Sequence, residues 1–185
     1  KQEKELKRLQ LGIEQVNSGV SFWSDDNKLI YANKFLRDFT KKSTGYDLVA
    51  GTDRIEYLEH SVSKGFISYG ERTAREVHNS LMDLIDKSEK GANLEFTTES
   101  NGKKEFWLNT AFRLQSGDWM QIITDISFQK KRESELNRLY EAIDKMSGGI
   151  IVWDRNHKLI FANKEMRDNP FGFEFKQGVS RHDML

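Results

Sequence analysis

The chain has 185 residues, and its 29 Lys and Arg residues balance its 29 Asp and Glu residues. This balance gives no global attraction to nucleic acid or to an anionic membrane. The absence of cysteine excludes disulfides, thiolate metal sites and thiol chemistry.

An apolar share of 37% beside a charged share of 31% is typical of a small domain with solvated helical extensions. The sequence has no run of about 18 apolar residues, so we expect no membrane segment in this chain. It also has no charged-then-apolar leader. We therefore expect a cytoplasmic protein, and we expect the chain to be an excerpt of a longer one.

Two charged, amphipathic segments, residues 1–17 and 128–147, are predicted to be helices. Each has apolar residues at alternating spacings of three and four, the a/d pattern of a coiled coil. The pattern favours a parallel homodimer, with packing of each helix on its own domain's sheet as the alternative. The seam residues are Leu6, Leu9, Ile13 and Val16 in the first helix and Leu136, Leu139, Ile143 and Met146 in the second.

The sequence contains an internal duplication, because residues 5–38 align with residues 135–168 without a gap. KLIYANK (28–34) recurs as KLIFANK (158–164). A repeat of domain length predicts tandem domains rather than a solenoid. We expect a helix at 1–17, a domain at 18–127, a linker helix at 128–147 and an incomplete second domain at 148–185. After a shortening by three residues, Gly45, Gly51, Arg54 and Leu58 align with Gly172, Gly178, Arg181 and Leu185.

The order of predicted elements is two strands, several helices, three long antiparallel strands and the exit helix. This order indicates an α+β fold, a sheet with helices on one face. Asn33 is placed to cap a helix that begins at KFLRDF. Strands are predicted at 20–24, 28–32, 93–99, 104–114 and 119–126, with helices at 52–64 (apolar face Ile55, Leu58, Val62) and 71–90 (apolar face Ala74, Val77, Leu81, Leu84, Ile85) and a tight turn at Asn101-Gly102.

Three motifs resemble the PAS domain family. Gly19-x-x-x-Trp23 followed by DDNKLIYAN resembles the family's opening hairpin, and residues 105–127 resemble its closing meander. Residues 124–127 (TDIS) resemble its Asp-Ile-Thr signature, with Ser in the Thr place. The resemblance implies a PAS-like antiparallel five-stranded sheet with helices on one face, flanked by the amphipathic linker helices. It also implies that Asp125 and Ser127 tie the last strand to the output helix and relay a signal.

The resemblance places a ligand pocket between the sheet and the 71–90 helix. By its helix position His78 lies at the edge of the apolar face. Haem-binding PAS domains present a ligating His from the corresponding helix, so His78 is a candidate haem ligand, with a partly exposed or core-satisfied His as the commoner alternative. Cysteine-based flavin photochemistry is excluded, while non-covalent flavin binding stays open. The pocket candidates are His78, Leu81, Ile85, Phe96, Leu108, Thr110, Phe112 and Ile123.

No catalytic motif is present, and we expect no catalytic residue in this chain. His60, His157 and His182 are scattered, which gives no zinc signature, and His60 is predicted to face water. The meander aromatics have no accompanying basic stripe, so we expect no nucleic-acid partner.

These observations support two hypotheses. The first is a sensory and dimerisation module, which relays ligand or packing state through the linker helix to a histidine kinase or nucleotide cyclase domain in cis. Any effector enzyme would lie outside this chain. The second is a ligand-free structural dimerisation spacer.

Overall fold

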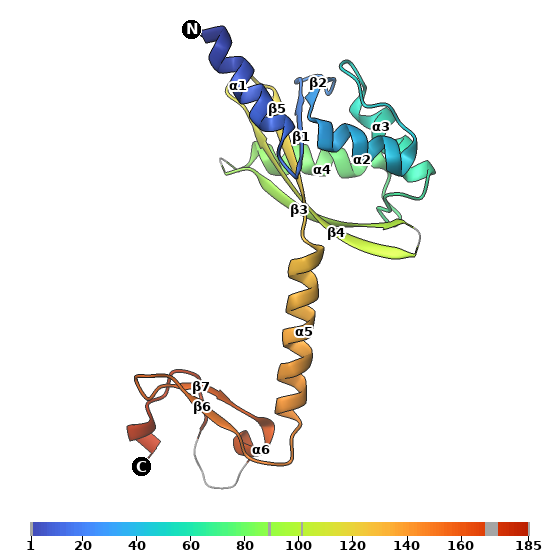
Figure 1. Ribbon diagram of the computed structural model, residues 1–185. Helices are drawn as coiled ribbons and strands as arrows, with labels where there is room; N and C mark the ends of the chain where they lie inside the picture. The colour runs from blue at the N-terminus through green and yellow to red at the C-terminus, as the bar shows by residue number, and fades with distance from the viewer. Residues whose placement is uncertain (1, 89, 101, 169–173, 185) are drawn as a thin grey trace. The chain divides into compact units, whose positions relative to one another are not determined.

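The computed structural model describes residues 2–88, 90–100, 102–168 and 174–184. Asn101, Gly172 and Leu185, which enter the predictions above, lie outside the described residues. The chain divides into two compact units, unit 1 (residues 1–128) and unit 2 (residues 129–185) (Figure 1).

Unit 1 contains a five-stranded sheet in which every neighbouring pair is antiparallel. The strand order is β2-β1-β5-β4-β3. Helices cover one face of this sheet, so the predicted α+β fold is confirmed (Figure 1). The strands are β1 (Gly19–Trp23), β2 (Leu29–Ala32), β3 (Ala92–Ser100), β4 (Lys103–Arg113) and β5 (Trp119–Asp125).

All four helices with predicted bounds, at 1–17, 52–64, 71–90 and 128–147, are shorter in the structure. The helix predicted at 1–17 ends at Glu14, where Asn33 Nδ2 donates a hydrogen bond to the Ile13 carbonyl. The helix predicted at 71–90 begins at Ala74, because Thr73 and Glu76 form a capping box. The helices are α1 (Gln2–Glu14), α2 (Lys34–Thr44), α3 (Arg54–Ser63), α4 (Ala74–Asp86) and α5 (Ser127–Asp144).

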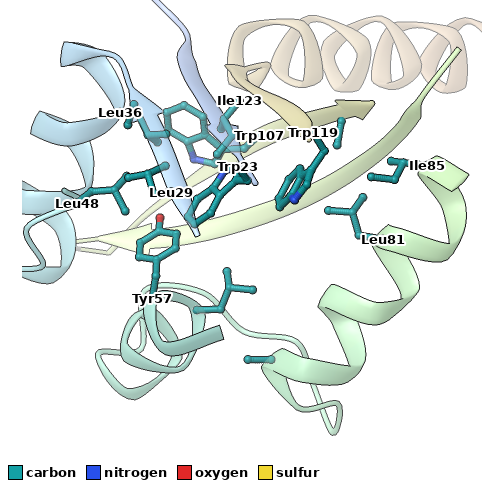
Figure 2. Packing of buried hydrophobic residues seen from close by; sticks show 14 residues of the cluster. Trp23, Leu29, Leu36, Leu48, Tyr57, Leu81, Ile85, Trp107, Trp119 and Ile123 are labelled. Atoms are coloured by element: carbon teal, nitrogen blue, oxygen red, sulfur yellow. The ribbon is translucent and has the colours of Figure 1, made fainter. Parts of the chain in front are cut away.

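The core of unit 1 lies between the helices and the covered face of the sheet. Trp23 of β1 and Trp119 of β5 stack at its centre, with ring centroids 5.6 Å apart and planes 14° from parallel. Leu81 and Ile85 of α4 extend toward this pair (Figure 2). Full burial of such large rings makes them the main hydrophobic contribution to this core.

Asn33 joins three elements at the end of β2. Its Oδ1 accepts hydrogen bonds from the Leu36 N–H at 3.2 Å and from the Val20 N–H at 3.0 Å. Its Nδ2 donates to the carbonyls of Ile13 at 3.1 Å and Ser18 at 2.9 Å. The predicted cap is therefore confirmed, and the same amide also fixes the end of α1.

Unit 2 repeats this arrangement around Asn163. Its Oδ1 accepts from the N–H groups of Ile150 and Met166, and its Nδ2 donates to the carbonyls of Ile143 and Gly148. Its elements are β6 (Ile151–Trp153), β7 (Leu159–Ala162), α6 (Lys164–Arg167) and a 3₁₀ helix (Arg181–Met184), and β6 and β7 pair with the same register irregularity as β1 and β2.

An acid–arginine pair accompanies each of these asparagines. Glu14 at the end of α1 faces Arg37 at 3.4 Å, and Asp144 at the end of α5 faces Arg167 at 2.9 Å. Burial alone would raise the pKa of Glu14, but hydrogen bonds from Tyr31, the Lys34 N–H and Arg37 outweigh it and lower the pKa. In both units the preceding helix is thus held at its C-terminal end.

Within the part of the chain that the structure describes, no helix combines the length and the apolar character of a membrane span.

Replacing Asn33 with Ala is expected to lower the free energy of unfolding by about 3 kcal/mol, because the change removes a helix cap and leaves the Val20 N–H buried without an acceptor. Urea denaturation followed by tryptophan fluorescence measures this. The control Asn79→Ala, at an exposed position of α4, should change the value by less than about 0.5 kcal/mol. Equal effects of the two substitutions would contradict the assigned role of Asn33.

Candidate ligand-binding site

A partly enclosed cavity of about 40 Å³ lies between α3, α4 and the covered face of the sheet in unit 1. A water molecule needs at least about 10–15 Å³ of such space, so the cavity admits only a small group of atoms. Its lining residues are Arg54, Tyr57, Leu58, Ile67, Tyr69, Val77, His78, Leu81, Leu94, Phe96, Asn109, Gln121 and Ile123.

Arg54 is the only charged side chain in that lining apart from the titratable His78. Asp53 caps α3, since its Oδ1 accepts from the N–H groups of Ile55 and Glu56, and this fixes the first turn. Arg54 then shares a helix face with Leu58 and points inward, with 5% of its surface exposed.

The Arg54 guanidinium rests against aromatic rings. Its carbon lies 4.9 Å from the ring centre of Trp23, 5.5 Å from that of Trp119 and 5.7 Å from that of Tyr57. Cation–π attraction to these rings offsets part of the cost of burying the charge. Burial still lowers the pKa of Arg54.

Several buried polar atoms around the cavity have no hydrogen-bond partner among the described residues. They are Arg54 Nε, His78 Nδ1, Asn109 Oδ1 and Gln121 Oε1. Native interiors leave few such atoms unsatisfied, so four on one small cavity call for an explanation. A bound molecule with polar atoms would supply it.

His78 is buried, with 4% of its surface exposed, rather than at the edge of the core as its helix position predicted. Burial, and secondly the positive charge of Arg54, lower its pKa from 6.5 to about 4. The imidazole is therefore neutral at pH 7. A space of about 40 Å³ is far below the roughly 300 Å³ of a pocket for a cofactor-sized ligand, so the residues present do not fit haem or flavin.

Four of the predicted pocket residues line the cavity together: His78, Leu81, Phe96 and Ile123. Ile85 lies in the packed core instead. The placement of Leu108, Thr110 and Phe112 in the pocket is wrong, because these residues alternate with the buried Trp107, Asn109 and Ala111 and therefore lie on the other face of the sheet.

Sequence reasoning missed the polar members of the site. On α3 the buried face is Arg54, Tyr57, Leu58 and Ser61, so the predicted face is wrong at Val62, which is exposed. The spacing from Arg54 to Leu58 carried that signal, but an arginine is seldom assigned to a core. The only sequence signal that Asn109 and Gln121 face the core is their position two residues after Trp107 on β4 and Trp119 on β5.

The predicted exposure of two further residues is wrong. Leu84, placed on the apolar face of α4, is exposed. His60, predicted to face water, is half-buried because the end of α2 and the next residues cover it: its Nε2 lies 3.0 Å from the Thr44 carbonyl oxygen, and its ring centre lies 4.9 Å from that of Tyr46. The described residues contain no group of three or more His, Cys, Asp or Glu placed to hold a metal ion.

The start of α5, which we call the helix root (residues 125–127), is anchored to β4. Asp125 Oδ1 accepts from the Ser127 N–H at 2.8 Å. Ser127 Oγ accepts from the Phe106 N–H at 2.9 Å, and the Ile126 N–H donates to the Phe106 carbonyl at 2.9 Å. The Asp125 side chain thus bonds to the first residue of the helix, while Ile126 and Ser127 bond to the neighbouring strand.

The predicted seam residues differ in their surroundings. In α1, Leu6, Leu9 and Ile13 line an open groove of about 420 Å³ whose other wall includes Phe22 and Ile30 of the sheet. In the described structure α5 has no buried residue. The exposed seam residues are Leu6, Leu9, Val16, Leu136, Leu139 and Met146, while Ile13 and Ile143 are half-buried.

Comparisons with known proteins place these features in context. No family model matches the chain. A lipopolysaccharide core heptose(II)-phosphate phosphatase from Escherichia fergusonii is 26% identical over 136 residues, which cover 68% of this chain and 70% of that protein.

The solved structures that are similar to the chain include two from signalling proteins. One is the PAS domain of an HTR-like protein from Haloarcula marismortui, with 19% identity, a TM-score of 0.44, and coverage of 67% of this chain and 93% of that one. The other is a domain of a sensory box sensor histidine kinase/response regulator from Geobacter sulfurreducens, with 16% identity, a TM-score of 0.44, and coverage of 68% and 97%.

Unit 1 has a PAS-like fold. The antiparallel sheet in the order β2-β1-β5-β4-β3, its helices on one face and the hydrogen-bonded TDIS root together carry this statement. The solved structures, with TM-scores below 0.5, add no argument about ligand or activity.

Stability should fall as the pH drops from about 6.5 toward 4, because His78 stays neutral in the folded protein while the unfolded chain takes up a proton. The contribution of His78 is fully present above pH 6.5, and its slope reaches at most about 1.4 kcal/mol per pH unit. Urea denaturation at several pH values measures it. His78→Phe should flatten the profile between pH 4 and 6.5, whereas the control His157→Asn should not; an unchanged profile in His78→Phe would contradict the assignment.

Proposed function

We propose that this chain is a sensory and dimerisation module of a signal-transduction protein. The cavity of unit 1 holds a ligand or changes its packing, and the helix root passes that state into α5. Residues 128–147 act as the linker between domain 18–127 and a second PAS-like domain that begins at 148. A histidine kinase or nucleotide cyclase domain further along the polypeptide would receive the signal in the cytoplasm.

The observation that carries this proposal is the course of β5. Gln121 and Ile123 of this strand line the cavity, and Asp125 follows two residues later at the root of α5. A change of contact at Gln121 therefore acts on the strand that positions the first turn of the helix. Since β4 holds the same root through Phe106, a relative shift of β4 and β5 would strain these hydrogen bonds.

Exposure of the helix seams supports dimerisation. Leu136 is 51% exposed and Leu139 is 60% exposed, on a helix rich in charged residues. Polar helices of this length are marginal by themselves in water and need a partner surface. A second copy of the same seam, in parallel, offers that surface with a/d packing.

The alternative is a ligand-free structural spacer. The small volume of the cavity favours it, because a nearly filled core needs no ligand. Native mass spectrometry of the purified chain separates the two: a ligand that co-purifies and depends on cavity residues supports the sensor, and a protein that is always free of ligand, with α5 insensitive to cavity substitutions, supports the spacer. We propose no catalytic activity for these residues.

Asp125→Ala should loosen the helix root without unfolding unit 1, since it removes the acceptor for the Ser127 N–H. The loss of such a hydrogen bond costs about 1 kcal/mol, which corresponds to about fivefold faster amide exchange in the first turn of α5. Hydrogen–deuterium exchange of residues 126–132 measures this. The control Asp47→Ala, at an exposed position, should leave the exchange unchanged, and equal protection in both variants would count against the relay.

Leu136→Glu combined with Leu139→Glu should convert a dimer into a monomer, because charges would then face each other in the seam. Analytical ultracentrifugation over a concentration series measures the dissociation constant, which we expect to rise by at least about 100-fold. The control is Asn137→Glu, on the same helix outside the seam. A wild-type chain that stays monomeric at all concentrations would refute the dimer.

A further inference from the structure

We infer that the cavity of unit 1 binds a short-chain monocarboxylate, whose carboxylate pairs with the guanidinium of Arg54. This inference rests on the proposed sensory function and specifies the class of ligand.

The first argument is charge. Arg54 is nearly fully buried, and none of the residues that line the cavity is an aspartate or a glutamate. Its guanidinium makes no hydrogen bond or ion pair with any described residue, and its contacts are with aromatic rings. Buried charges in proteins are ordinarily paired. The missing partner of Arg54 is therefore an anion.

The second argument concerns hydrogen bonds. The rings of Trp23, Trp119 and Tyr57 attract the cation but accept no in-plane N–H bond of the kind that a carboxylate accepts from a guanidinium in fork-like geometry. The side-chain amide oxygens of Asn109 and Gln121 also lack partners. Either end of such an amide can be turned toward a ligand, so both amides can donate N–H groups to its oxygens.

His78 does not supply a second positive charge. Burial and the nearby Arg54 keep its imidazole neutral at pH 7, and the other charged groups that influence it, Asp53, Arg75 and Arg113, have smaller effects. The site therefore offers a single positive charge, which matches a monoanion. A dianion such as a phosphate monoester would leave a buried negative charge in excess, and a cation would be repelled.

The third argument is size. A volume of about 40 Å³ admits a carboxylate with a short tail, but no ring system. The remaining walls are apolar, with Leu58, Val77 and Leu81 from the helices and Leu94 and Ile123 from the sheet. An apolar tail of one to three carbons suits these walls, which selects acids of the acetate, propionate and butyrate type.

Isothermal titration calorimetry of the full chain, in a buffer without carboxylate ions, tests the inference with acetate, propionate and butyrate. Propionamide is the neutral control of the same shape, and inorganic phosphate and chloride are the inorganic controls. The matched variants are Arg54→Met, which removes the charge at similar volume, and Arg75→Met, at an exposed position of α4. Urea denaturation of each variant confirms that it is folded.

We expect saturable binding of at least one of the three acids, no binding of propionamide, and at least about a tenfold loss of affinity in Arg54→Met with no change in Arg75→Met. Equal affinity of folded Arg54→Met, equal binding of propionamide, binding of phosphate or chloride alone, or no heat with any acid would each overturn the inference. The proposed function has a separate readout: if no acid binds but another co-purifying ligand alters exchange at residues 126–132, the sensor stands and the carboxylate inference falls.

Discussion

The centre of unit 1 is a cation held among aromatic rings. Trp23 and Trp119 stack across neighbouring strands, and the Arg54 guanidinium lies against both. The stack fixes β1 against β5, and Arg54 fixes the first turn of α3 against that pair. A fully hydrophobic residue at position 54 would pack there without the cost of burying a charge. The chain instead has an arginine whose N–H donors are unsatisfied. The cost of burying this charge is offset if an anionic ligand binds to it.

The strand β5 connects the cavity of unit 1 to the helix root at the start of α5. Trp119 begins β5, Gln121 and Ile123 follow on the same face, and Asp125 ends the strand at the helix root. A molecule paired with Arg54 would therefore touch one strand at successive inward positions. Neighbouring strands of a sheet can shift slightly relative to each other. A shift of β5 against β4 would change the hydrogen bonds between the helix root and Phe106.

The sequence predicted the framework well because its signals are local. Alternation gave the three long strands, and Asn33 and the TDIS segment were placed by position alone. Which face of β4 is buried was not predictable in this way. Phe106, Leu108 and Phe112 are more apolar than Asn109 and Ala111, yet the larger tryptophans, Trp107 and Trp119, decide the inner face. Arg54 was missed for the related reason that a core cation depends on tertiary contacts with rings distant in sequence.

The hydrogen bonds that hold the end of each preceding helix have a consequence for how the helices α1 and α5 can vary in sequence. Asn33 and Asn163 hold α1 and α5 through main-chain carbonyls. These hydrogen bonds do not depend on the side chains of the earlier helix residues. The exposed residues of α1 and α5 can then differ in charge, and can suit different partner surfaces, while the hydrogen bonds to Asn33 and Asn163 are kept. A linker of this design needs only a helix of the right length whose end keeps the acidic residue that pairs with Arg37 or Arg167.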